Sequence, residues 1–354
     1  MRRLPQAVPA VVALAAPPPP SAAAGSASAA AAMPSASTAL ARCQAQAVAA
    51  RRALSSSDAV LAELAWFKEP DEGQLAAAWE RSARQLQGSP EARQRAAGLL
   101  MGRLPSHLPG AVPAPPADVT SLVSLALASS DPTALLWAVN ACAAQASQAA
   151  CQGLSPRIWV AAEPDNLLAW LPLLAREPQA REEALQGMAQ ARRADGGWMR
   201  WAAVINAARP ADLSAELRLA FGSRLLSRPA ALPIPAWQGL LAACKDDALA
   251  DARRRGQCDQ IARLMVDQGR ELVTVYLGYA IGKGLGWPPE REQDHQALRS
   301  AARQLGPDLL GPGSSSDCDA LRLDHWLLQV DSLGEVGLLR QALRAEPAAA
   351  QPPR

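Results

Sequence analysis

Six cysteines are the residues of this chain best suited to covalent chemistry, and four of them share one pattern. Cys142 and Cys151 are nine residues apart, and Cys244 and Cys258 are fourteen apart. Each lies at the end of a run spaced i, i+3, i+4, i+7, which is one face of a helix. A disulfide requires Cα atoms about 4.4–6.8 Å apart, whereas nine residues of unbroken helix span about 13 Å. The spacing therefore predicts two helical hairpins, each linked by a disulfide close to its turn.

Polar residues between the partners are candidate starts for the second helix of each hairpin. These are Ser147 and Asp251, whose side chains are suited to an N-cap. Buried free thiols, which are common small hydrophobes in helical cores, are the alternative interpretation. An even number of cysteines behind an export-like N-terminus favours disulfides. Cys43 and Cys318 remain, and no pattern assigns them to each other.

Tryptophan dominates the aromatic residues, with ten tryptophans against two tyrosines and two phenylalanines. Trp198 and Trp201 lie three residues apart on one face of an expected helix, directly after Gly196 and Gly197. Indole offers a flat apolar face and one hydrogen-bond donor, so the pair is a candidate binding face for a sugar or a peptide. Packing between helices is the alternative use of the same pair.

Residues of other chemical types form no recognisable catalytic pattern. His107, His295 and His325 have no partner at metal-ligand spacing, so no zinc site is predicted. The run 278–286 contains Gly-Lys, but it lacks the hydroxyl residue and the preceding strand of a phosphate-binding loop. Close packing between helices explains its glycines more simply. We therefore predict no catalytic residue, no metal and no cofactor.

Bulk composition limits the classes of partner. The chain has 354 residues, 49% of them hydrophobic, and a net charge of +2. This length exceeds what one compact core usually fills, which indicates two domains or an elongated helical array. A nearly neutral charge gives no reason to expect nucleic acid as a partner. No run of eighteen apolar residues follows the N-terminus, so no membrane-spanning helix is predicted there.

The N-terminal residues have features of an export signal. Arg2 and Arg3 precede a short apolar stretch over 7–16, and Ala-x-Ala sites follow it. We interpret residues 1–41 as a signal peptide, which would place the protein in the periplasm or outside the cell. A disordered Ala/Pro-rich leader on a cytoplasmic protein is the alternative.

Hydrophobic periodicity close to that of a helix recurs along the rest of the chain. We predict a helical segment over 42–104, a Pro-rich linker over 105–116, a helical repeat-like domain over 117–345 and a disordered tail over 346–354. The stretch 272–281 is rich in Val and Tyr but is assigned to a helix, because a lone strand would leave its backbone unpaired. The predicted fold class is all-α.

One segment, 163–195, carries the pattern of a known helical hairpin. It has a Pro-x-Asn entry, a Trp and a Leu on the first helix, and spaced small or apolar residues on the second: Pro164, Asn166, Trp170, Leu173, Ala184, Met188 and Ala191. In these positions it resembles a tetratricopeptide repeat. The resemblance implies antiparallel hairpins stacked as a tetratricopeptide-like or α-solenoid-like array. The layout is also similar to exported proteins of high-GC proteobacteria with spaced cysteines, which implies export and no particular activity.

Together these observations favour an exported, non-enzymatic helical scaffold that offers a groove to a protein or peptide partner in the cell envelope. One alternative is an all-α periplasmic enzyme acting on cell-wall material, with an acidic residue beside Trp198 and Trp201. Such an enzyme requires a buried carboxylate of raised pKa in a cleft. A structural component of the envelope is the third hypothesis.

Overall fold

Helices form the regular secondary structure of the described chain. A computed structural model describes residues 38–43, 45–46, 71–102, 118–144, 148–227, 237–309 and 316–349. The chain divides into two units, 1–42 and 43–354, and all elements discussed below belong to the second. Within the described ranges there is no strand, only two isolated β-bridges. The prediction of an all-α chain is confirmed.

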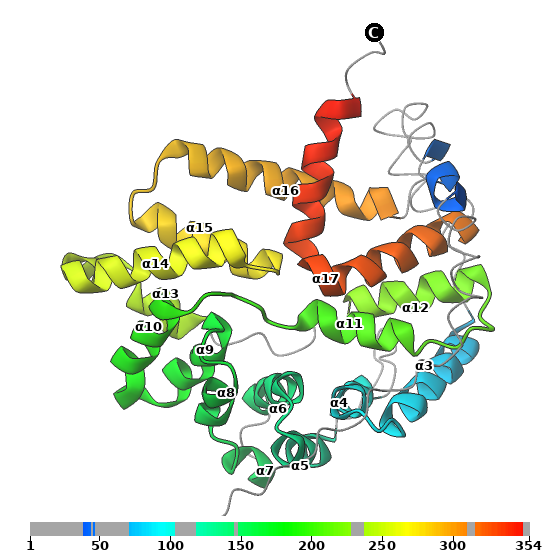
Figure 1. The fold of residues 1–354 in the computed structure, drawn as a ribbon, viewed down its shortest axis with the longest axis horizontal. Coiled ribbons are helices and arrows are strands. Elements are labelled where there is room, and N and C mark those ends of the chain that lie inside the picture. Colours follow the sequence, from blue (N-terminus) through cyan, green and yellow to red (C-terminus); the bar gives the residue numbers. More distant parts are fainter. Residues whose placement is uncertain are drawn as a thin grey trace, which may run out of the picture. The chain divides into compact units, whose positions relative to one another are not determined.

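The helices follow one another along the chain (Figure 1). They are α3 (Glu72–Gln87), α4 (Ala92–Met101), α5 (Val119–Ser129), α6 (Pro132–Ala144), α7 (Ala149–Gln152), α8 (Pro156–Ala162), α9 (Leu167–Arg176), α10 (Arg181–Gln190), α11 (Trp198–Ala207), α12 (Ala215–Ser227), α13 (Gln238–Ala243), α14 (Ala252–Gln268), α15 (Leu272–Gly284), α16 (Pro289–Leu309) and α17 (Ser316–Ala349). Short 3-10 helices lie at Pro178–Ala180 and Asp246–Ala250. Helix α15 confirms the assignment of 272–281 to a helix.

Several predicted features lie wholly or partly outside the described residues. The linker 105–116 and Ser147 do so entirely, and the leader 1–41 does so apart from its last few residues. The predicted tail is only partly outside, because α17 continues to Ala349 and its first residues are therefore helical.

Most buried apolar side chains form one large group, called here the main cluster. Neighbouring helices pack in succession, as α3 does on α4, α5 on α6 and α9 on α10. However, α11 and α12 also pack on α17, and α3 packs on α12. In a strict solenoid each repeat contacts only its neighbours. These long-range contacts instead join the beginning and the end of the described chain in one core.

Helix α17 changes direction at Gly334, where φ is 71° and ψ is 167°. A residue with a side chain rarely adopts this conformation, so glycine permits the kink. Residues of α17 before the kink, such as Leu323 and Leu327, belong to the main cluster. Val336 and Leu339 after it belong to a smaller group, called here the second cluster: Val266, Val275, Tyr279, Leu298, Ala301, Val336 and Leu339. Figure 1 shows the two parts of α17 running in different directions.

The run that starts at Cys151 with the spacing i, i+3, i+4, i+7 ends at Ile158, and the prediction that it forms one helix is wrong. Helix α7 ends at Gln152, and α8 begins at Pro156 after Ser155, whose hydroxyl accepts a hydrogen bond from the Arg157 amide at 3.3 Å. Proline at the first helical position needs no partner for an amide hydrogen, so this pair starts a new helix efficiently. Ile158 consequently does not share a face with Cys151 and is 37% exposed.

The segment that resembles a tetratricopeptide repeat forms α9 and α10, which pack on each other. Asn166 is the N-cap of α9, and its side chain accepts a hydrogen bond from the Leu168 amide at 3.3 Å. The ring of Trp170 lies against Gly187, where an added Cβ would be 2.4 Å from the ring. Glycine therefore allows the indole of one helix to approach the backbone of the next. The repeat relationship itself stays a prediction.

Candidate functional site

The four cysteines singled out by their spacing lie at disulfide distance in the predicted pairs. Their Cα atoms are 5.2 Å apart for Cys142–Cys151 and 5.6 Å apart for Cys244–Cys258. A third pair, which the sequence left open, joins Cys43 to Cys318 near the start of α17, with Cα atoms 5.2 Å apart. All six cysteines are thus in disulfides.

The two predicted links differ in their surroundings. Cys244 caps α13 and Cys258 lies in α14, which starts as predicted at Asp251, whose carboxylate accepts a hydrogen bond from the Arg254 amide at 2.8 Å. Cys142, in contrast, joins α6 to the four-residue helix α7 rather than to a second long helix. The disulfide is present in both places, but only the second resembles the predicted hairpin.

The tryptophan face proposed for ligand binding does not exist at Trp201. Its side chain is 0% exposed, and its Nε1 donates to the carbonyl of Ala97 at 3.4 Å. The reason is that α11 packs against α4 on one side and α17 on another. The side chain of Trp198 lies outside the described part of the structure. Packing, the alternative interpretation, accounts for Trp201.

Histidine chemistry is equally limited. The His295 ring stacks on Tyr279 with centroids 4.7 Å apart, and burial lowers the pKa of His295. His107 lies outside the described residues. In the part of the chain that the structure describes, no three His, Cys, Asp or Glu side chains are grouped so that they could hold a metal ion.

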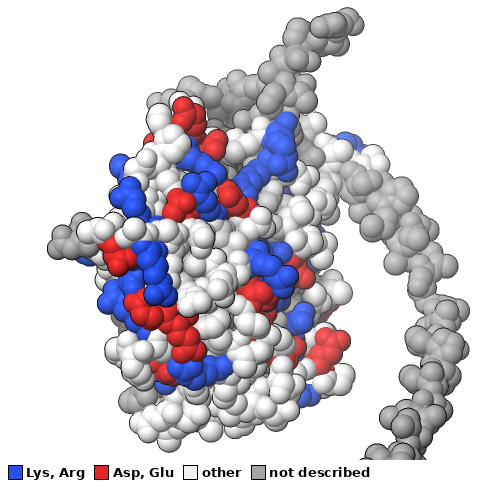
Figure 2. All heavy atoms as spheres, turned by 60° about the vertical axis from the view of Figure 1, so that its left-hand side comes forward, with Lys and Arg blue, Asp and Glu red and all other residues white. Residues whose placement is uncertain are grey.

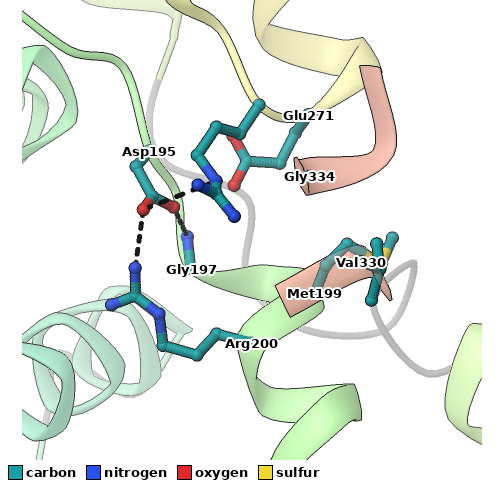
Figure 3. A pocket seen from close by; sticks show the side chains of 8 residues that line it. Asp195, Gly197, Met199, Arg200, Glu271, Val330 and Gly334 are labelled. Carbon is teal, nitrogen blue, oxygen red and sulfur yellow. Dashed lines mark hydrogen bonds and ion pairs between the residues drawn. The ribbon is translucent and has the colours of Figure 1, made fainter. Parts of the chain in front are cut away.

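A group of buried and half-buried charges lies where three distant segments meet, and we call it the polar junction (Figure 3). It comprises Asp195 before α11, Arg200 in α11, Arg270 and Glu271 before α15, and Glu335 after the kink in α17. Backbone contacts bring these segments together. The amide of Arg270 donates to the Ala194 carbonyl at 3.2 Å, and the Val336 amide donates to the Arg270 carbonyl at 3.1 Å.

Asp195 is the paired carboxylate of the junction. Its Oδ2 lies 2.6 Å from Nη2 of Arg200 and 3.8 Å from Nε of Arg270 (Figure 3). Its Oδ1 accepts from the Gly197 amide at 2.9 Å. Gly197 is the N-cap of α11 and has a positive φ of 67°, which glycine adopts without steric cost.

Glu271 is the unpaired carboxylate of the junction. It is 4% exposed, and Oε1 accepts from the Gly196 amide at 2.8 Å, while Oε2 is buried without a hydrogen-bond partner among the described residues. Burial, followed by the negative charge of Asp195, raises the pKa of Glu271 to about 8. Burial also raises the pKa of Glu335, although the Leu272 amide donates to it at 2.9 Å. The space beside Glu271 is about 10 Å³, enough for one water.

An open surface feature lies further along α15, and we call it the aromatic groove. It consists of two hollows of about 280 and 290 Å³ that share Tyr279 and Arg291. Tyr279, only 5% exposed, forms part of the floor. The walls come from α14, α15, α16 and the C-terminal part of α17, and include Asp267, Lys283, Trp287, Asp294, Leu298, Arg340 and Leu343.

The groove walls are fixed by packing and by hydrogen bonds. The Trp287 ring covers Gly282, where an added Cβ would be 2.3 Å away, and Nε1 of Trp287 donates to Asp259 at 2.8 Å. The guanidinium of Arg291 lies 5.4 Å from the centroid of Trp287, within the range of a cation–π contact. Arg291 also donates to Asp267 at 3.0 Å. The hollows are therefore built by ordered side chains.

The surface charge is mixed. The face shown in Figure 2 carries basic and acidic side chains side by side instead of a large patch of one sign, in keeping with a net charge of +2. None of the described helices combines the length and the apolar character needed to cross a membrane.

Sequence reasoning missed both the polar junction and the floor of the groove. Glu271 and Glu335 look like ordinary acids next to helices. Only the meeting of segments that are 75 residues apart, at Gly196 and Glu271, and 63 residues apart, at Leu272 and Glu335, brings them together with Asp195. The sequence offered only a weak indication that Tyr279 forms part of a site, namely its position next to the glycines that allow close helix packing. The chain matches no protein-family model, and no curated protein or solved structure is similar to it.

Proposed function

We propose that this protein is an extracytoplasmic helical scaffold that binds a peptide segment of a partner protein in the aromatic groove. The observation that carries the proposal is the groove itself, with its two hollows on either side of Tyr279 and Arg291. Each hollow is near the lower limit of about 300 Å³ for ligand sites. That size suits one side chain in each hollow better than one bulky small molecule.

The chemistry of the walls indicates which peptide would fit. Leu298 and Leu343 offer apolar surface in the second hollow. In the first hollow, exposed Lys283 and half-buried Arg291 offer positive charges against one acid, Glu292. We therefore expect a segment with an acidic side chain beside an apolar one. Aromatic and arginine side chains at the centre, here Trp287 and Arg291, are the types that most often dominate binding energy.

The proposed compartment is the periplasm or the exterior of the cell. Disulfides form and persist in oxidising environments and are rare in the reducing cytosol. Three pairs that use every cysteine support this location. The packed pair α9 and α10 supports the tetratricopeptide-like relationship, since such hairpins commonly build scaffolds with concave surfaces.

One observation favours the rival hypothesis of an all-α enzyme acting on cell-wall material. Glu271 is a buried carboxylate of raised pKa, as a general acid would be. However, the space beside it is about 10 Å³, which cannot admit a sugar, and Trp201 is buried in the core. A purely structural envelope component would need neither the groove nor a buried carboxylate of raised pKa. Peptide binding in the groove therefore has the better support.

The test is selection from a random peptide library displayed on phage, using the oxidised full chain as the target. We expect selected peptides to lose about tenfold in affinity, about 1.4 kcal/mol, for Lys283→Glu. Arg181→Glu is the matched control, because Arg181 is also exposed but lies on α10 outside the groove. Peptides that bind wild type and Lys283→Glu equally, or a selection that yields none, would contradict the proposal.

A further inference from the structure

The polar junction lies at the root of the C-terminal part of α17. Directly after the kink, Glu335 accepts from the Leu272 amide and the Val336 amide donates to the Arg270 carbonyl. Further along, Arg340 donates to the Val266 carbonyl at 2.7 Å. These polar contacts, with the second cluster, attach the C-terminal part of α17 to α14 and α15.

The anchorage differs on the two sides of the kink. Before it, α17 packs on α11 and α12 in the main cluster and is tied by the Cys43–Cys318 disulfide. After it, Val336 and Leu339 pack in the second cluster with residues of α16, Leu338 alone reaches the main cluster, and all six cysteines lie elsewhere. Gly334, with a φ of 71°, is a natural hinge between a fixed part and a part held only by non-covalent contacts.

The charges around Glu271 do not balance when every acid is ionised. Asp195 faces it from the segment before α11, Arg200 from α11, Arg270 from the same turn and Glu335 from α17. Asp331 of α17 completes the set, 3.9 Å from Arg200. Four carboxylates would then face two guanidiniums. With protons on Glu271 and Glu335 the count is two against two, so a compact junction favours those protons.

We propose that the polar junction is a proton-operated latch, closed while Glu271 carries a proton, and that rising pH releases α16 and the C-terminal part of α17 about Gly334. A protonated Glu271 is neutral, and its hydroxyl can donate to a water in the small space beside Oε2. Loss of the proton leaves a buried negative charge next to Asp195. Opening of the hinge exposes that charge to water. It also separates the apolar side chains of the second cluster, which is the smaller of the two apolar groups.

The direction of the pH effect follows from linkage. The pKa of Glu271 is raised in the closed state, so the stabilisation is full below the ordinary pKa of a glutamate and is lost as pH rises toward about 8. Burial raises the pKa of Glu335 too, which acts in the same direction. This latch does not depend on the proposed peptide binding, and it predicts a response of the free protein.

Hydrogen exchange of the oxidised full chain tests the latch, with rates corrected for the intrinsic pH dependence. We expect protection of amides in 335–344 to fall at least tenfold between about pH 6 and about pH 8. At both pH values these amides should be less protected than those of α6. Glu271→Gln, which keeps an acceptor for the Gly196 amide but cannot ionise, should remove most of the fall.

Two further variants make the outcome decisive. Glu335→Gln should weaken the fall and substitutes for Glu271→Gln if that variant does not fold. Glu290→Gln, an exposed acid on α16, should respond as wild type does. Equal protection of the amides in 335–344 and in α6 at both pH values would overturn the proposal. So would a fall in protection that is as large in Glu271→Gln as in wild type. If Glu271→Gln does not fold, the same comparison is made with Glu335→Gln.

Discussion

The main cluster and the second cluster are held together by different means. Four of the six cysteines lie in the main cluster, and Cys43 and Cys318 are buried beside the helices that form it. The second cluster contains no cysteine and depends on a few apolar side chains and on the polar junction. The large core therefore carries covalent links in addition to its packing, whereas the small one depends on the acids of the polar junction. The difference indicates which part opens first.

The largest effect in this comparison is expected from the longest disulfide loop. Replacing both Cys43 and Cys318 by serine should lower the free energy of unfolding by about 5 kcal/mol, because the link closes a loop with a sequence separation of 275. The same change at Cys142 and Cys151, with a separation of 9, should cost only about 2.5 kcal/mol. Urea denaturation of the two double variants measures the ranking. Equal losses would show that loop entropy does not govern these links.

Next in size is a core truncation in the main cluster. Trp201→Ala removes a side chain that is 0% exposed, and we expect a loss of about 4 kcal/mol in the free energy of unfolding. Leu328→Ala is the control, because Leu328 is 66% exposed and its loss should change stability by less than about 0.5 kcal/mol. A small effect of Trp201→Ala on the urea midpoint would show that Trp201 is not a core residue.

A smaller effect is expected at the hinge. Gly334→Ala places a Cβ 2.9 Å from the Arg270 carbonyl oxygen at a φ of 71°, and it should destabilise the attachment of 335–344 by about 1–3 kcal/mol. Protection from hydrogen exchange in this segment measures that loss. Gly256→Ala is the matched control, since nothing lies within 4 Å of its added Cβ and a helix interior favours alanine by about 1 kcal/mol. If both variants behave alike, the kink has no role in the attachment.

Local signals in the sequence were sufficient for much of the fold. The lack of any partner strand predicted a helix at α15 despite its Val and Tyr content, and the Asp251 cap marked the start of α14. The cysteine spacing gave the two pairs that lie at disulfide distance. The apolar spacing between Cys151 and Ile158 wrongly predicted one helix. Ser155 and the following proline start a new helix there.

Long-range convergence accounts for what the sequence did not reveal. Periodicity shows that Trp201 has neighbours on its face, but it cannot show that α4 and α17 cover that face. The polar junction depends in the same way on three segments that meet only in the folded chain. No local pattern distinguishes Glu271 and Glu335 from the exposed acids on α16. A buried acid is therefore recognised from the structure and not from its neighbours in sequence.

Native-state hydrogen exchange in increasing urea at neutral pH tests most directly whether the two clusters differ in stability. Amides of 335–344 should exchange through an opening whose dependence on urea is smaller than that of global unfolding, while amides of α6 and α11 should exchange only with the steep dependence of global unfolding. Coincident free energies and slopes for these segments at all urea concentrations would contradict this account, because both clusters would then unfold together.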